Sequence, residues 1–334
     1  MNNPDIEIIA EVGSVHDGSF GNAQKLIEMA AQLGADIVKF QTHISAAETL
    51  ANAPNPPYFT GETRYDYFNR TGFKPDQWKV LKAKADEAGI GFISSPFSHE
   101  AVDLLEEVGI EIYKIPSGEV SNIPLLEHIA QTGKQVYLSS GMSDWAELDA
   151  AVKALGTERL TIMQCSSEYP CRPENVGINV ISEMAQRYGV RTGYSDHTTG
   201  FAAAILALAA GAKVIEKHIT FSKKMYGSDA AHSMEPDDFA LFCSMLKEAA
   251  QIQAHPVDKD AVSKYANMKG TFEKSIVTRK NVKKGEVISL DNIAFKKPGT
   301  GIPAARYKDI LGQVFASDIA ADSLLKETDI KANG

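Results

Sequence analysis

The sequence predicts an α/β fold: a (β/α)₈ TIM barrel followed by a small, β-rich C-terminal domain. Eight short β-rich runs, each followed by an amphipathic helical stretch, fill the chain to about residue 250, and eight such units close a parallel barrel. Beyond Gln251 a polar connector begins, and from Thr271 the chain is made of short β-like pieces and turns. The predicted boundaries are 1–255 for the barrel, 256–270 for a linker and 271–334 for the second domain.

The predicted elements follow from hydrophobic periodicity and from helix-ending glycines. The strands are expected at Glu7–Ala10, Ile37–Phe40, Gly91–Ser94, Ile112–Ile115, Gln135–Leu138, Leu160–Gln164, Val190–Gly193 and Lys213–Glu216. The helices are expected at Asn22–Leu33, Pro75–Ala88, His99–Val108, Pro124–Gln131, Trp145–Leu155, Val180–Tyr188, Phe201–Ala210 and Pro236–Gln251. An open, doubly wound sheet is the alternative, but it usually has fewer units and a glycine-rich turn after its first strand.

One connection, from His43 to Lys74, is unusually long. It is rich in proline and aromatic residues: Pro54, Pro56, Pro57, Tyr58, Phe59, Tyr65, Tyr67 and Phe68. Loops of this length are usually functional or disordered. Because the aromatic content argues against disorder, we predict a partly ordered lid or a subunit contact.

Composition and charge exclude several classes of function. The chain is 44% hydrophobic and 23% charged, so it can bury a large core. Its net charge of −9, without a basic stripe, argues against nucleic acid or an anionic membrane as partner. Three cysteines without paired spacing fit a reducing compartment. We recognise no secretory signal or membrane-spanning run, so we expect a cytoplasmic protein.

Polar and charged residues lie at or just after the end of each of the eight predicted strands, where the active sites of TIM barrels are built. They include Glu11, Lys39, Gln41, Ser94, Lys114, Ser117, Glu119, Ser139, Gln164, Tyr169, Ser195, His197, Glu216 and His218. Lys39 and Gln41 alternate with Val38 and Phe40, so they are expected to point to one side of their strand. Such a rim suits a phosphorylated, polyhydroxylated substrate.

His197 and His218 close two neighbouring strands, so their imidazoles can share one metal ion. With only two nitrogen ligands, Mn²⁺ or Mg²⁺ is expected rather than a closed zinc site. Lys39 and Lys114 cannot reach water from inside a barrel wall, so we expect them to hold an anion, with Ser117 and Ser195 as further donors. A Schiff-base aldolase would also need a buried lysine.

Six motifs in order resemble the sialic acid synthase family over nearly the whole chain. They are Glu11-Val-Gly-Ser-Val-His-Asp-Gly, Val38-Lys-Phe-Gln-Thr-His43, Tyr113-Lys-Ile-Pro-Ser-Gly-Glu119, Tyr194-Ser-Asp-His-Thr198, Glu216-Lys-His-Ile-Thr220 and Gly227-Ser-Asp-Ala-Ala-His-Ser-Met234. The C-terminal part looks like the β-clip-like, antifreeze-like (SAF) domain of that family. The resemblance implies condensation of phosphoenolpyruvate with N-acetylmannosamine or a related (di)acetamido hexose, with release of phosphate.

The resemblance also implies roles for individual residues. Lys39, Lys114, Ser117 and Ser195 would hold phosphoenolpyruvate, and Glu11, Gln41, Tyr169 and Asp229 would bind the open-chain sugar. His197 and His218 would bind the metal, and Glu119 would position or deprotonate the water that attacks C2. Glu119, Glu11, His197 and His218 are thus the expected catalytic groups. Family members are dimers in which the SAF domain of one subunit caps the barrel of the other.

Three positions depart from the family pattern. Lys297 stands before Pro-Gly where the family commonly has an arginine that reaches the N-acetyl group of the sugar, and the two side chains are not equivalent in such a site. Ser167 replaces an asparagine near the phosphate, and Pro116 replaces a glycine. The phosphoenolpyruvate half of the site is kept, whereas the sugar half is altered. A precursor of a legionaminic, pseudaminic or spore-coat sugar is therefore an alternative acceptor.

Three rival functions remain open at this stage. A related phosphoenolpyruvate-dependent synthase of 3-deoxy sugar acids would lack the SAF-like segment 271–334. A Schiff-base pyruvate aldolase would form a covalent lysine adduct. A binding protein with an inert barrel would show gaps among the polar strand ends, and the key positions show none.

Overall fold

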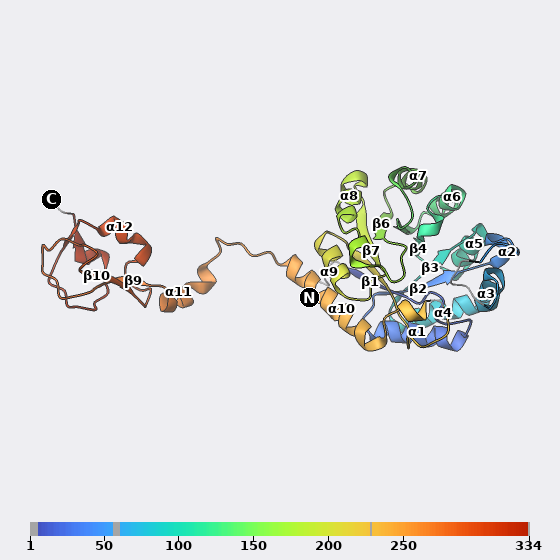
Figure 1. Ribbon diagram of the computed structural model, residues 1–334, viewed down its shortest axis with the longest axis horizontal. Coiled ribbons are helices and arrows are strands. Elements are labelled where there is room, and N and C mark those ends of the chain that lie inside the picture. Colours follow the sequence, from blue (N-terminus) through green and yellow to red (C-terminus); the bar gives the residue numbers. More distant parts are fainter. Residues whose placement is uncertain (1–5, 56–60, 228, 333–334) are drawn as a thin grey trace. The chain divides into compact units, whose positions relative to one another are not determined.

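The computed structural model describes residues 6–55, 61–227 and 229–332. The chain divides into two compact units, Met1–His255 and Pro256–Gly334, which we describe separately. The first unit is a closed barrel of eight parallel strands paired in chain order, each strand next to its sequence neighbour and β8 next to β1 (Figure 1). This confirms the predicted (β/α)₈ barrel and excludes the open, doubly wound sheet.

The strands fall where the sequence predicts them, but most run further toward their carboxyl ends. Their bounds are β1 Glu7–Glu11, β2 Ile37–Thr42, β3 Gly91–Pro96, β4 Ile112–Ile115, β5 Gln135–Ser139, β6 Leu160–Cys165, β7 Arg191–Asp196 and β8 Val214–His218. The added residues are mostly polar, such as Glu11, Gln41, Asp196 and His218. The sequence-based prediction ended the strands near the end of each hydrophobic run. In the structure, the hydrogen-bonded strand pairing continues into the polar residues of the rim.

The helices surround the barrel in the order of the chain (Figure 1). Those after the strands are α1 Phe20–Gln32, α4 Pro75–Ala88, α5 His99–Val108, α6 Ile123–Gln131, α7 Trp145–Leu155, α8 Asn179–Tyr188, α9 Ala202–Ala209 and α10 Pro236–Ala254. Side chains cap several of their first turns, as where Asp144 accepts a hydrogen bond from the backbone N–H of Glu147. In the part of the chain that the structure describes, no helix combines the length and apolar character needed to cross a membrane.

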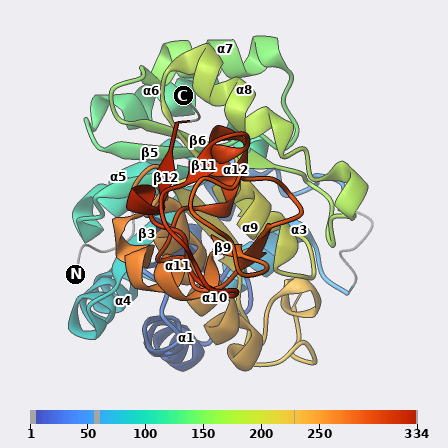
Figure 2. The ribbon, with the colours of Figure 1, turned by 90° about the vertical axis from the view of Figure 1, so that its left-hand side faces the viewer.

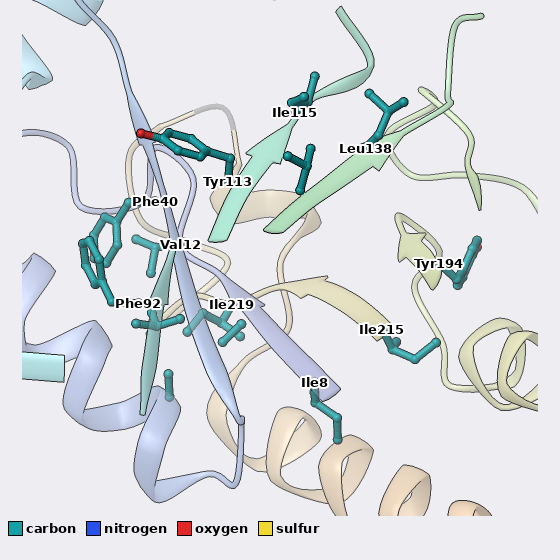
Figure 3. Close-up of a cluster of buried hydrophobic side chains, with 14 of the residues drawn as sticks. Ile8, Val12, Phe40, Phe92, Tyr113, Ile115, Leu138, Tyr194, Ile215 and Ile219 are labelled. Carbon is teal, nitrogen blue, oxygen red and sulfur yellow. The ribbon is translucent and has the colours of Figure 1, made fainter. Parts of the chain in front are cut away.

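Strand alternation separates two hydrophobic clusters. Ile8 and Phe40 face outward and pack under the helices (Figure 3), and Val38 belongs to the same cluster. Ile9 and Ile37 belong to a second cluster inside the barrel, with Ile93, Tyr137, Met163 and Val214. Because side chains alternate along a strand, the residue two places beyond Ile9, which is Glu11, also points inward, and Lys39 is its partner in the β1–β2 register. The hydrophobic cluster inside the barrel therefore lies below a layer of charged side chains.

The long connection after β2 contains two short helices, α2 Ser45–Glu48 and α3 Arg64–Thr71. Pro56, Pro57, Tyr58 and Phe59 of the predicted aromatic loop lie outside the described residues, so the role of this loop stays a prediction.

The C-terminal unit has its own small core of Ile276, Val282, Ile288, Ile293, Ile302, Ile310, Phe315 and Leu325. Its strands form two antiparallel pairs, β9 Ser275–Thr278 with β10 Ile293–Lys296, and β11 Val314–Phe315 with β12 Ile330–Lys331 (Figure 2). Two helices accompany them, α11 Ala266–Phe272 and α12 Tyr307–Ile310. The segment expected to be a linker thus contains the start of α11.

Candidate active site

The candidate site lies at the carboxyl ends of the barrel strands. Because all eight strands are parallel and closed in chain order, residues at the ends of β1, β2, β4, β7 and β8 share one rim. The structure therefore brings together these expected residues: Glu11, Lys39, Gln41, Lys114, Ser117, Glu119, Ser195, His197 and His218. Their proposed roles remain predictions, and the geometry below shows what each can contact.

Four buried charges form the floor of the rim: Glu11, Lys39, Lys114 and Glu216, which we call the buried quartet. Glu216 joins both lysines, with Oε1 3.0 Å from Nζ of Lys39 and Oε2 3.6 Å from Nζ of Lys114. Glu11 lies 3.4 Å from Lys39. All four residues are at most 3% exposed, so their charges interact with little screening by water.

The quartet corrects one step of the sequence analysis. We expected the lysines to depend on a bound anion, but Glu216 is a built-in counter-ion for both. Sequence reasoning recorded Glu216 only as a polar strand end and gave it no role. Its position in the site could have been predicted. Glu216 precedes His218 by two places on β8, so the two side chains point to the same side of the sheet.

Burial and pairing shift the pKa values of the quartet. Burial raises the pKa of Glu11 to about 7, against the opposing charge of Lys39. Burial would also raise the pKa of Glu216, but the two ammonium groups outweigh it and lower the value to about 2. The pKa of Lys114 is lowered by burial, whereas the two carboxylates raise that of Lys39 above its ordinary value. With all four groups charged, the quartet is neutral overall.

The two expected metal ligands are neighbours at this rim. The ring centroids of His197 and His218 are 5.7 Å apart, and the ring of Tyr169 lies 4.0 Å from that of His197. Nδ1 of His197 is 2.9 Å from the backbone oxygen of Ser166. A proton on that nitrogen leaves Nε2 with a free lone pair, which is the arrangement seen in many metal-binding histidines.

His218 supplies the test of whether a metal fits. Its Nδ1 is buried and has no hydrogen-bond partner within the described residues, and a buried polar atom without a partner is costly. Burial lowers the pKa of His218, which favours the neutral imidazole that binds metals. No group of three or more His, Cys, Asp or Glu residues suited to a metal occurs in the described chain. The pair therefore fits an ion that takes its other ligands from water and substrate.

Among the residues expected to bind the sugar, Asp229 is tied to the turn after β1. Asp229 Oδ2 accepts hydrogen bonds from the backbone N–H of Ser14 at 2.7 Å and from its hydroxyl at 2.8 Å. Gly13 has a φ of +52°, and a Cβ there would lie 2.4 Å from the same Asp229 oxygen, so only glycine fits. Gln41 Nε2 donates to Glu11 Oε1 at 2.7 Å. Three of the four expected sugar ligands, Glu11, Gln41 and Asp229, thus belong to one corner.

The part of the rim expected to hold phosphoenolpyruvate includes Ser117, which lies against Gly141. Ser117 Oγ accepts from the backbone N–H of Gly141 at 2.9 Å. A Cβ on Gly141 would lie 2.6 Å from Ser167 Oγ and 2.7 Å from Ser117 Oγ, so this glycine lets the two hydroxyls converge. Lys114 Nζ donates to Ser139 Oγ at 2.7 Å. Ser139 and Gly141 were not among the predicted site residues, although the Ser139-Ser140-Gly141 strand end signalled them.

Glu119 lies on a 3₁₀ turn, η1 Ser117–Glu119, directly after β4. Asn122 Nδ2 donates to its Oε2 at 2.8 Å. Burial raises the pKa of Glu119, while the Asn122 hydrogen bond opposes the rise and the charge of Glu48 adds to it. Asn122 was not predicted as a site residue, and nothing in its local sequence distinguishes it from an ordinary helix cap.

Lys297 belongs to the C-terminal unit, where its Nζ lies 5.2 Å from the ring centroid of Phe272. Its neighbour Lys296 pairs with Asp322. The expected role of Lys297 at the barrel site therefore stays a prediction.

The closed barrel with this polar rim belongs to the class of TIM-barrel enzymes. Residues 26–257 match the NeuB family and residues 273–331 match the SAF domain. The chain belongs to the NeuB family, which confirms the resemblance stated from its motifs.

Similar proteins agree with this family. The chain is 36% identical to an N,N'-diacetyllegionaminic acid synthase of Campylobacter jejuni, over 96% of this chain and 98% of the relative. It is 31% identical to the human N-acetylneuraminate-9-phosphate synthase, over 98% and 93% of the two chains. A crystal structure of the N-acetylneuraminic acid synthetase of Leptospira borgpetersenii, in complex with citrate, superposes with a TM-score of 0.71 at 29% identity, over 81% of this chain and 93% of that one.

Proposed function

We propose that this protein condenses phosphoenolpyruvate with an open-chain amino sugar to give a nonulosonic, sialic-acid-like acid and phosphate. The observation that carries the proposal is the buried quartet beside the His197–His218 pair at the carboxyl rim of the barrel. The names of the relatives support the same class of reaction.

Phosphoenolpyruvate would bind over the quartet on the Lys39 and Lys114 side. The two ammonium groups, with the hydroxyls of Ser117 and Ser195, provide donors for its carboxylate and phosphate. Ser195 Oγ donates to Glu216 at 3.1 Å and so lies beside both lysines.

Glu11, Gln41, Tyr169 and Asp229 would bind the sugar so that its aldehyde carbon faces C3 of phosphoenolpyruvate. The enol π electrons form a new bond from C3 to that carbon, and positive charge develops at C2. The π electrons of the aldehyde C=O move to its oxygen, which takes up a proton and becomes a hydroxyl. Glu119 stabilises that charge and takes a proton from the water whose oxygen adds to C2. The resulting intermediate expels phosphate and leaves the C2 ketone.

Synthases of the NeuB family are generally metal-dependent. In this chain His197 and His218 would hold the ion, with Mn²⁺ proposed ahead of Mg²⁺ because two imidazole ligands suit it better. A bound divalent cation would polarise the aldehyde oxygen of the sugar.

The acceptor we propose is a 2-acetamido or 2,4-diacetamido hexose. The 36% identity to an N,N'-diacetyllegionaminic acid synthase and the lysine at position 297 favour the diacetamido sugar over N-acetylmannosamine. We further propose a cytoplasmic homodimer in which the SAF domain, with Lys297, caps the barrel of the other subunit. The boundaries 1–255, 256–270 and 271–334 are part of that proposal.

A phosphate-release assay tests the reaction. Phosphoenolpyruvate, Mn²⁺ and a panel of 2-acetamido and 2,4-diacetamido hexoses should release phosphate in proportion to product, fastest with a diacetamido sugar. Glu119→Gln should lower kcat by at least about 100-fold while leaving phosphoenolpyruvate affinity nearly unchanged. Near-normal turnover in this variant, or no phosphate with any sugar, would contradict the proposal.

A Schiff-base aldolase is the second candidate, because the lowered pKa of Lys114 is a property that such a lysine needs. Borohydride reduction in the presence of pyruvate decides between the two. We expect no covalent adduct, and an adduct on Lys114 would replace the proposed mechanism.

A further inference from the structure

His43 is held between two aromatic rings in the connection after β2. Its ring stacks on Phe68 and Phe97, with centroids 3.6 Å and 4.0 Å apart and interplanar angles of 19° in both cases. Its side chain is 7% exposed. A phenylalanine or tyrosine would pack in this sandwich equally well, so packing alone does not explain a histidine here.

Both ring nitrogens of His43 are engaged. Nδ1 lies 2.8 Å from Oε1 of Glu48 on α2, and Nε2 lies 3.2 Å from Oε1 of Gln41 on β2. Gln41 in turn donates from Nε2 to Glu11, and Glu11 is paired with Lys39. A continuous chain of contacts thus runs from Glu48 to His43, Gln41 and the buried quartet.

The proton positions along this chain are constrained. With Glu11 ionised, its carboxylate only accepts, so the amide N–H₂ of Gln41 faces Glu11 and its carbonyl faces His43. Nε2 of His43 therefore carries a proton. A hydrogen bond between Nδ1 and Glu48 then requires one further proton between the two groups. Without a partner that fixes Nδ1, the ring could move its proton and present a lone pair to Gln41.

We propose that His43, set by Glu48, is a positioning residue that fixes the orientation of the Gln41 carboxamide and thereby aims Gln41 and Glu11 at the sugar. This inference rests on the proposed function, in which Gln41 and Glu11 bind the acceptor. In this role His43 acts through Gln41.

The surroundings of His43 support a fixed hydrogen-bond role. The Glu48 side chain is 5% exposed, and its Oε2 has no hydrogen-bond partner among the described residues. Glu48 is thus held in the wall rather than solvated, and its contact with Nδ1 is the hydrogen bond that fixes it. The other charges that act on His43 are those of Arg64 and Asp229. The charge of Glu48 also raises the pKa of Glu119. Glu48 of α2 therefore acts both on the corner with Gln41 and on the residue proposed to take a proton from water.

The experiment uses the full-length protein and compares KM for the sugar with KM for phosphoenolpyruvate. His43→Phe keeps the aromatic sandwich and removes both hydrogen bonds. We expect it to raise KM for the sugar about tenfold or more, the loss of one buried hydrogen bond to a site residue, with KM for phosphoenolpyruvate nearly unchanged. Tm should fall in this variant, because the buried Glu48 carboxylate loses its Nδ1 partner. His128→Phe is the matched control, because His128 also stacks on a ring, His99, and pairs with a carboxylate, Asp103, but lies on the outer face of α6.

Two substitutions of Glu48 test the proton argument separately. In Glu48→Gln the amide N–H₂ can donate to Nδ1 and so keeps the proton on Nε2, and sugar KM should stay close to wild type. Glu48→Ala leaves Nδ1 without a partner, and sugar KM should rise as in His43→Phe. Equal effects of these two variants, or a parallel change of both KM values, would overturn the proposal in favour of a packing role. If the wild-type protein released no phosphate with any sugar, the proposed function itself would fail instead.

Discussion

Oε1 of Glu216 lies 3.0 Å from Nζ of Lys39, inside the barrel and below its rim. The same carboxylate reaches Lys114, so one glutamate of β8 pairs with a lysine of β2 and a lysine of β4. Both lysines are proposed phosphoenolpyruvate ligands, and their spacing is therefore set by a residue that need not touch the substrate.

Removal of the Glu216 charge should destabilise the fold. Glu216→Gln leaves two buried ammonium groups with Glu11 as their one remaining partner in the quartet, and breaking a buried pair costs about 3–5 kcal/mol. We expect the free energy of unfolding, measured in urea, to fall by that amount at pH 7. Glu28→Gln, which removes a surface carboxylate paired with Lys25 and Lys84, is the control and should change little. Equal effects of the two variants would contradict the role of Glu216.

The stabilisation from Glu216 should also depend on pH in a defined direction. Its pKa in the folded protein is lowered to about 2 from an ordinary 4.5. A group with a lowered pKa stabilises the fold fully above its unfolded value and loses that effect as the pH falls toward the folded value. The difference in unfolding free energy between wild type and Glu216→Gln should therefore be constant above about pH 5.5 and shrink below pH 4.5. A difference that grew on acidification would contradict the assignment.

The acid limb of the activity profile should report on Glu119. Its pKa is raised by burial, with the hydrogen bond from Asn122 opposing the rise. Because the proposed role needs the carboxylate, kcat/KM should fall on acidification at a pH above 4.5. Asn122→Asp keeps an acceptor for the first turn of α6 but removes the donor to Glu119, so the limb should move to higher pH. If the acid limb of kcat/KM were unchanged in this variant, Glu119 would not be the group whose ionisation controls activity.

Metal binding should depend on both histidines. His218→Ala removes one of the two proposed ligands, and the affinity for Mn²⁺ should fall by more than the roughly 10–100-fold expected for loss of an outer-sphere partner. Direct titration with Mn²⁺ in the absence of substrates provides a readout that does not need turnover. His255→Ala, at the exposed end of α10, should leave the affinity unchanged. Wild-type affinity in His218→Ala would refute the site.

The close approach at Gly141 predicts a selective effect on phosphoenolpyruvate. A Cβ there would collide with the hydroxyls of Ser117 and Ser167, so Gly141→Ala should raise KM for phosphoenolpyruvate while leaving KM for the sugar near wild type. Gly118→Ala is the matched control, because among the described residues its Cβ would meet Met142 Cε alone, at an ordinary 3.7 Å. A rise of both KM values in Gly141→Ala would indicate general distortion of the rim.

Local patterns in the sequence sufficed for the architecture. Eight alternating units gave the barrel, and the bounds of α4, α5 and α7 were predicted to the residue. Strand ends were predicted less well, because polar residues such as Gln41 and His218 continue the ladder beyond the hydrophobic run. Hydrophobic periodicity reports burial against apolar neighbours. It therefore cannot detect the part of a strand that buries charged side chains.

The closed sheet alone decided which charged side chains contact one another. The sequence by itself determined that Lys39, Lys114 and His218 lie at strand ends and that Lys39 and Gln41 share a face. The tertiary structure decided that Glu216 serves both lysines and that Glu48 reaches Gln41 through His43. These partners come from different strands or from a loop folded back on the rim, and side-chain pairing over such separations depends on barrel closure and register, which no local pattern specifies.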